Sequence, residues 1–194
     1  MSRLQHVSPE AATGQAKELL NAVKGKLGMI PNMTQVMAIA PSVLDGYLSL
    51  SGALSKGSLP PKTREHISLA VGEANSCNYC VSAHSAIGKS VGLTAEQILD
   101  SRRGTAVDPK ADAAIQFARQ VLETRGQVSN ADLSAARAAG LDDPALAEIV
   151  ANVALNVFSN YFNNVAETEI DFTKAAPLNR ESASACGTEA CHVR

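Results

Sequence analysis

The sequence has no run of Lys or Arg, and its charges nearly balance. Its 194 residues hold 17 Lys and Arg against 19 Asp and Glu, which gives a formal net charge of −2. Proteins that bind nucleic acids or anionic membranes through charge usually carry a basic patch or stripe. The composition therefore argues against a nucleic acid or a membrane as a partner.

Long apolar segments are missing as well. The N-terminal stretch "MSRLQHVSPEAATG" contains no apolar core of signal-peptide length. The longest apolar stretch, "IVANVALNVF", is too short and too rich in Asn to cross a bilayer. We therefore expect a cytoplasmic protein. Because thiols stay reduced in that compartment, a close cysteine pair there is more often catalytic or metal-binding than structural.

Strand signals are absent too, because no segment shows sustained alternation with β-branched residues. Helix starts and stops recur instead: Pro9 predicts a helix that runs to about Lys24, and Thr94 with Gln97 forms a capping-box pattern. We expect an all-α fold of about nine helices in a single domain, residues 1–172. Residues 173–194 lose the helical pattern and are expected to form a flexible tail.

The stretch "SCNYCVSAH", residues 76–84, carries the densest chemistry in the chain. Asn75 and Ser76 are good N-cap residues, which predicts that one helix breaks there and that a new one begins at Cys77. On that helix Cys80 lies about 60° from Cys77, and His84 falls between them in angle. The three side chains therefore share one stripe, with Cys80 and His84 four residues apart and able to touch.

This arrangement favours thiol chemistry. A helix N-terminus stabilises a thiolate, a nearby imidazole can take the thiol proton, and a second thiol can close a disulfide on the oxidised first sulfur. The alternatives are a chance CxxC spacing, a structural disulfide, which the compartment disfavours, and a zinc site. A zinc site would need further ligands, and the tail offers only Cys186, Cys191 and His192.

A proton relay also needs a carboxylate, and two glutamates precede the motif. If one helix ran unbroken through Cys77, Glu73 would lie on the same stripe and Glu65 about 120° away from it. If the chain breaks at residues 75–76, Glu65 can approach from a separate helix. The residues alone leave both glutamates open.

The stretch "REHISLAVGEANSCNYCVSAH" resembles the core motif of the alkylhydroperoxidase AhpD-like proteins of the carboxymuconolactone decarboxylase superfamily, in their peroxidase-related branch. That motif has a Glu twelve residues before a CxxC and a His four residues after the second Cys. The residues Glu65, Cys77, Cys80 and His84 each match it. The likeness extends over roughly residues 4–172.

The resemblance implies roles for these side chains. Cys80 would meet the peroxide and become a sulfenic acid, Cys77 would resolve it into a disulfide, and Glu65 with His84 would relay the proton. The best-known AhpD proteins have a histidine directly before the second Cys, where this sequence has Tyr79, a poor base near neutral pH. The decarboxylase branch generally lacks the paired cysteines, so that activity is not expected.

The leading hypothesis is therefore a thiol-dependent peroxidase that reduces hydroperoxides at the expense of a dithiol or protein reductant. The resemblance also implies a homo-oligomer, a trimer or a hexamer, and no cofactor or metal is expected. The alternatives are a disulfide-exchange protein with little peroxidase activity and a metal-binding module. A ladder of Asn152, Asn156, Asn160 and Asn164 in the last helix predicts hydrogen bonds between helices or subunits, or else a polar wall of the substrate pocket.

Overall fold

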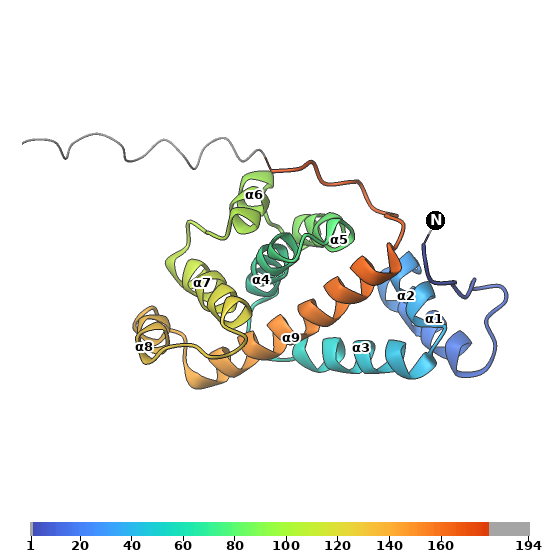
Figure 1. Cartoon of the computed structure of the whole chain (residues 1–194), viewed down its shortest axis with the longest axis horizontal. Coiled ribbons are helices and arrows are strands. Elements are labelled where there is room, and N and C mark those ends of the chain that lie inside the picture. The colour runs from blue at the N-terminus through green and yellow to red at the C-terminus, as the bar shows by residue number, and fades with distance from the viewer. Residues whose placement is uncertain (1, 179–194) are drawn as a thin grey trace, which may run out of the picture.

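The computed structural model describes residues 2–178, which form nine α-helices and no strand (Figure 1). The expected all-α class is confirmed. The helices are α1 Gly14–Leu27, α2 Asn32–Met37, α3 Pro41–Leu54, α4 Pro61–Ala74, α5 Asn78–Ser90, α6 Ala95–Arg103, α7 Pro109–Glu123, α8 Asn130–Ala138 and α9 Asp143–Ala166. None of the helices within residues 2–178 has the length and apolar character that a bilayer crossing requires.

Helix α4 lies at the centre of the bundle, where it contacts α5, α6, α7 and α9 (Figure 1). Its residues 66–72 are all buried, which fits a helix surrounded by others on every side. One core cluster joins α4 to α7, α8 and α9 around Ile67, Val71 and Ile149. A second cluster joins α1, α2 and α3 to the start of α5, and it contains Cys77 and Cys80. The cysteines therefore lie in packed core.

The predicted break between two helices at residues 75–76 is confirmed. The second helix, α5, begins at Asn78, one residue later than expected. Asn75 ends α4, and Ser76 takes a left-handed backbone conformation with φ of 53°. Cys77 is not the first helical residue but the N-cap of α5, because its sulfur accepts the backbone N–H of Cys80 at 3.2 Å. The capping box of Thr94 and Gln97 at the start of α6 is also confirmed.

The first helix begins later than the sequence indicated. Ser8 holds one isolated turn, since its carbonyl accepts the N–H groups of Ala11 and Ala12. Thr13 is then extended, with φ of −131°, and α1 starts only at Gly14. The expectation that Pro9 opens this helix was wrong, because the Ser8 turn satisfies the same backbone donors locally.

The segment after α9 runs along α5 and α6. The N–H of Ala175 donates to the hydroxyl of Ser82 at 3.1 Å, and the Arg102 guanidinium donates to the carbonyl of Ala176 at 2.8 Å. The domain boundary after Phe172 stays a prediction. The tail residues Cys186, Cys191 and His192 lie outside the described residues.

Candidate active site

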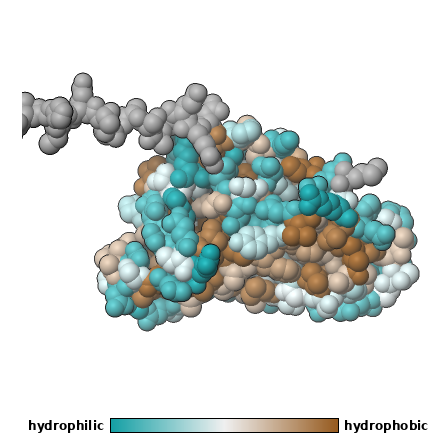
Figure 2. Space-filling view, in the orientation of Figure 1, coloured by the Kyte–Doolittle hydropathy of each residue, from teal (hydrophilic) through white to brown (hydrophobic). Residues whose placement is uncertain are grey.

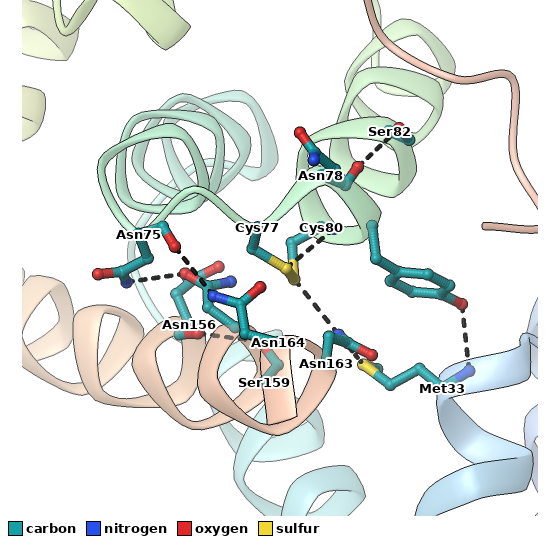
Figure 3. Close-up of a disulfide and its surroundings, with 12 residues drawn as sticks. Met33, Asn75, Cys77, Asn78, Cys80, Ser82, Asn156, Ser159, Asn163 and Asn164 are labelled. Atoms are coloured by element: carbon teal, nitrogen blue, oxygen red, sulfur yellow. Dashed lines mark hydrogen bonds between the residues drawn. A yellow bond between two sulfur atoms is a disulfide. The ribbon is translucent and has the colours of Figure 1, made fainter. Parts of the chain in front are cut away.

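The two cysteines of the motif are joined by a disulfide at the N-terminal end of α5 (Figure 3). Their Cα atoms are 5.3 Å apart, which the first turn of a helix provides. Cys77 is fully buried and Cys80 is 3% exposed. The disulfide therefore closes within a single helical turn, and the fold shields both sulfurs from bulk solvent.

Glu65 and His84 meet across the interface of α4 and α5. The Glu65 Oε2 to His84 Nδ1 distance is 2.8 Å, and the side chains are 13% and 21% exposed. An ionised carboxylate can only accept, so Nδ1 carries the proton of this hydrogen bond. The other ring nitrogen, Nε2, is then free to take or give a proton. The pair has the geometry of a base and its orienting carboxylate.

Glu73 is placed elsewhere, although it lies on the same helix as Glu65. Its carboxylate is 2.8 Å from the Arg102 guanidinium, whose side chain is only 5% exposed. The break at residues 75–76 turns α5 away from the axis of α4, so the spacing argument for an unbroken helix does not apply. Of the two glutamates, only Glu65 reaches His84.

His84 makes no hydrogen bond to either sulfur within the described part of the chain, although it follows Cys80 by one helical turn. Both cysteines are in the disulfide, so neither offers a thiol proton to the imidazole. In this oxidised form the described residues therefore show no hydrogen bond between Cys80 and His84, and a direct contact in the reduced form stays a prediction.

Asn163 of α9 is a site residue that the sequence reasoning missed. Its side-chain N–H group donates to the Cys80 sulfur at 3.3 Å and to the Met33 sulfur at 3.1 Å, and Figure 3 shows it between the disulfide and α2. Asn163 follows Asn156 by seven residues, which places the two on the same face of the helix within about 20°. That seven-residue spacing is a signal in the sequence, and it lies outside the four-residue ladder of Asn152, Asn156, Asn160 and Asn164.

The Asn ladder holds the break between α4 and α5 in place. Asn160 accepts a hydrogen bond from the Asn75 side chain at 2.9 Å, and Asn164 donates to the Asn75 carbonyl at 3.0 Å (Figure 3). Asn156 donates to the Ser68 hydroxyl of α4 at 3.2 Å. The prediction of hydrogen bonds between helices is confirmed for these three residues. Asn152 instead bonds the carbonyl of Glu148 within its own helix.

Tyr79, which takes the place of a family histidine, is buried and anchors α2. Its phenol oxygen accepts the backbone N–H of Met33 at 3.2 Å, and its ring packs edge-on against Phe172. Burial, together with the nearby charge of Asp171, raises the pKa of Tyr79 well above its usual range. The phenol therefore keeps its proton at neutral pH, which suits a structural contact better than a relay.

Tyr47 of α3 lies close enough to Glu65 to be affected by its charge. Burial, with a further contribution from the charge of Glu65, raises the pKa of Tyr47 to about 12. Its ring packs against Phe158 of α9 with centroids 6.4 Å apart. Glu65 of α4 is thus affected by side chains of both α3 and α5.

Comparison with known proteins agrees with this fold. The model of the carboxymuconolactone decarboxylase family matches residues 41–124, which include all four motif residues. A solved structure described as the alkylhydroperoxidase AhpD core, an uncharacterized peroxidase-related protein from Ralstonia eutropha JMP134, is 27% identical with a TM-score of 0.80. That match covers 88% of this chain and 92% of the other. The match to the family model and the likeness to the AhpD core make this an AhpD-like fold with a carboxymuconolactone decarboxylase family region at residues 41–124.

Two further structures share the fold at lower identity. One is an uncharacterized peroxidase-related protein from Silicibacter sp. TM1040, 20% identical, with a TM-score of 0.69 and coverage of 84% and 85%. The other is the debrominase Bmp8 in complex with 2,3,4-tribromopyrrole, 18% identical, with a TM-score of 0.75 and coverage of 88% and 92%. No curated protein matches the sequence.

Proposed function

We propose that this protein is a thiol-dependent peroxidase that reduces hydroperoxides through Cys77 and Cys80. Two observations together carry the proposal. A disulfide lies at the N-terminus of α5, and a Glu65–His84 pair at 2.8 Å joins α4 to the same helix. The likeness to the AhpD core at 27% identity supports the same activity. No other constellation of the described residues offers comparable redox chemistry.

In the proposed cycle the Cys80 thiolate attacks the terminal oxygen of the hydroperoxide. An S–O bond forms, the O–O bond breaks, and the alkoxide leaves as an alcohol after it takes a proton. The Cys77 thiol then attacks the sulfenic sulfur of Cys80 and releases water, which leaves the disulfide seen in the structure. Two electrons return from a dithiol or protein reductant by thiol–disulfide exchange.

Glu65 and His84 move the protons in this proposal. The carboxylate holds Nδ1 of His84 at 2.8 Å and stabilises the imidazolium, so that Nε2 can accept the Cys80 thiol proton in the reduced enzyme. The same nitrogen can return the proton to the departing alkoxide. Since both side chains are less than a quarter exposed, the charge of Glu65 acts on the ring with little screening.

The order of the cysteines follows from their different contacts. Cys77 is the N-cap and accepts the Cys80 backbone N–H, so the helix terminus favours negative charge there. Cys80 receives the side-chain N–H of Asn163 instead and lies one turn before His84. We assign peroxide attack to Cys80, because it receives the Asn163 N–H and precedes the candidate base His84 by one helical turn.

The test is a peroxide-consumption assay with a panel of dithiol reductants, run beside trapping of sulfenic acid. Turnover of hydrogen peroxide or alkyl hydroperoxides, with one intramolecular disulfide formed per peroxide, is expected. Efficient disulfide exchange with partner proteins but negligible peroxide turnover would replace the peroxidase with an exchange protein.

We also propose a homo-oligomer, a trimer or a hexamer, built on the outer face of α9. A stripe of large apolar side chains follows that face at helical spacing: Val150, Phe158, Tyr161 and Val165, with exposures of 45%, 38%, 55% and 64%. Figure 2 shows apolar side chains gathered over α3 and α9 on one side of the molecule. A contiguous apolar stripe of this kind is typical of a protein–protein interface.

A further inference from the structure

A groove of about 390 Å³ opens beside the candidate active site, between the start of α5 and the end of α9. Its walls include Asn78 and Tyr79 of α5, Asn163 and Asn164 of α9, and Thr168 just beyond that helix. Asn163 thus lines the groove and also donates a hydrogen bond to the Cys80 sulfur at 3.3 Å. It connects solvent-accessible space to a cysteine that is itself 3% exposed.

Two polar atoms on this wall are buried without a hydrogen-bond partner among the described residues. They are the side-chain oxygen of Asn163 and the hydroxyl of Thr168, in residues that are 3% and 7% exposed. A buried polar group without a partner typically costs about 1–3 kcal/mol. Their shared position on one groove wall indicates a ligand that supplies the missing contacts.

The orientation of the Asn163 amide follows from its neighbours. Sulfur atoms act as acceptors towards an N–H group, so the amide nitrogen faces Cys80 and Met33. The amide oxygen at the other end of the same group has no hydrogen-bond partner among the described residues. Because Asn163 lines the groove, a donor that enters this wall can give the buried oxygen the partner that it lacks.

We propose that this groove binds the hydroperoxide substrate and that Asn163 aligns it with Cys80. This inference rests on the proposed peroxidase function and names its substrate site. The amide oxygen of Asn163 accepts the O–H of the peroxide, while the amide N–H stays on the Cys80 sulfur. The hydroxyl of Thr168 supplies a second polar contact. One side chain thereby holds the nucleophile and the terminal oxygen together.

The step is balanced without any further oxidant. The Cys80 thiolate gives an electron pair to the terminal oxygen, the S–O bond forms and the O–O bond breaks. Sulfur is oxidised to the sulfenic acid, and the peroxide is reduced to an alkoxide, which leaves as the alcohol after protonation. Asn163 transfers no proton, and it acts by binding and orientation alone.

The groove wall also indicates a substrate class. Six of the eight described residues that line the groove carry an amide or hydroxyl group, and the one charged residue among them, Glu167, is paired with Arg3. Because Arg3 offsets the charge of Glu167, the wall offers a substrate hydrogen-bonding groups rather than a net charge, which suits a small polar group better than a long acyl chain. The favoured substrates are therefore small, uncharged hydroperoxides that form hydrogen bonds, with hydrogen peroxide as the simplest.

The experiment measures sulfenic acid formation on Cys80 in a Cys77→Ser background, where the intermediate cannot be resolved. Asn163→Leu removes both amide contacts at similar size, and Thr168→Val removes only the hydroxyl. Asn152→Leu is the matched control, since Asn152 is buried on the same helix and its side chain bonds only the Glu148 carbonyl. Each variant is also reacted with iodoacetamide, which alkylates the thiolate but has no peroxide O–H.

Asn163→Leu should slow the hydrogen peroxide reaction by roughly 10- to 100-fold, the range expected when a hydrogen bond to a charged group is lost. Thr168→Val should slow it roughly 3- to 10-fold and leave the iodoacetamide rate unchanged. In Asn163→Leu the peroxide rate should fall further than the iodoacetamide rate. The preference of the parent protein for hydrogen peroxide over linoleic acid hydroperoxide should shrink in the same variant.

Two outcomes separate the possible failures. If the parent protein forms sulfenic acid readily but both groove variants keep its ratio of peroxide to iodoacetamide rates, the groove is not the substrate site and the peroxidase proposal stands. If the parent protein forms no sulfenic acid with any hydroperoxide, the proposed function itself is wrong and the inference falls with it. Thr168→Val keeps the test decisive if Asn163→Leu does not fold.

Discussion

Replacing Glu65 by Gln tests both the helix break and the proton relay, and Glu73→Gln is its matched control. Both glutamates belong to α4, and each lies 2.8 Å from one basic partner, His84 for Glu65 and Arg102 for Glu73. The same substitution at each position removes one charge and keeps the shape. Only the Glu65 change touches the group that the proposal uses to move protons.

The structure sets the size of the expected effect. At 2.8 Å and an effective dielectric constant of about 20, a carboxylate and an imidazolium attract each other by about 6 kcal/mol, which is a ceiling for this pair. General acid–base catalysis typically contributes 10²- to 10⁴-fold in rate, or about 3–5 kcal/mol. Because Gln still accepts the His84 N–H, we expect Glu65→Gln to slow peroxide reduction by about 10²-fold.

Glu73→Gln should behave in the opposite way. Arg102 is 5% exposed and would lose its anionic partner, so the free energy of unfolding should fall by about 1–3 kcal/mol. The rate of peroxide reduction should stay within a few-fold of the wild type. Urea denaturation gives the stability, and stopped-flow single turnover gives the rate of disulfide formation. A wild-type rate in Glu65→Gln, combined with a large loss of rate in Glu73→Gln, would refute the reasoning.

Three further predictions concern the cysteines, acid stability and assembly. Cys80→Ser should abolish peroxide turnover, while Cys77→Ser should accumulate a sulfenic acid on Cys80, seen by mass spectrometry; an adduct on Cys77 alone would reverse the roles. The backbone N–H groups of Ser58 and Leu59 donate hydrogen bonds to the Glu148 carboxylate. These bonds lower the pKa of Glu148 below its ordinary value of about 4.5. Its stabilising contribution is therefore complete above that value and is lost as pH falls through the lower folded value. Wild type should lose more stability than Glu148→Gln between about pH 5 and pH 3, and parallel urea midpoints over that range would contradict this. Tyr161→Glu should convert the oligomer to monomers in sedimentation velocity, whereas the exposed Lys110→Glu should not; a monomeric wild type would remove the proposed interface.

Local sequence determined the features that depend on neighbours within one or two helical turns. The capping box of Thr94 and Gln97 and the start of α5 at the Cys77 N-cap both follow from side chains that bond the adjacent backbone. The CxxC spacing placed two sulfurs on the first turn of a helix, within reach of a disulfide. At Ser8 and Pro9 two local signals competed. The sequence predicted a helix start there, and the structure has an isolated turn.

Only the tertiary structure decided which distant side chains complete the site. Spacing left Glu65 and Glu73 open, and the packing of α5 against α4 brought Glu65 alone to His84. Asn163 reaches Cys80 from 83 positions along the chain, because the end of α9 lies against the start of α5. Helix geometry fixes neighbours at about 1.5 Å of rise per residue. The approach of one helix to another depends instead on the joint packing of many side chains from several helices, and no single stretch of sequence contains that information.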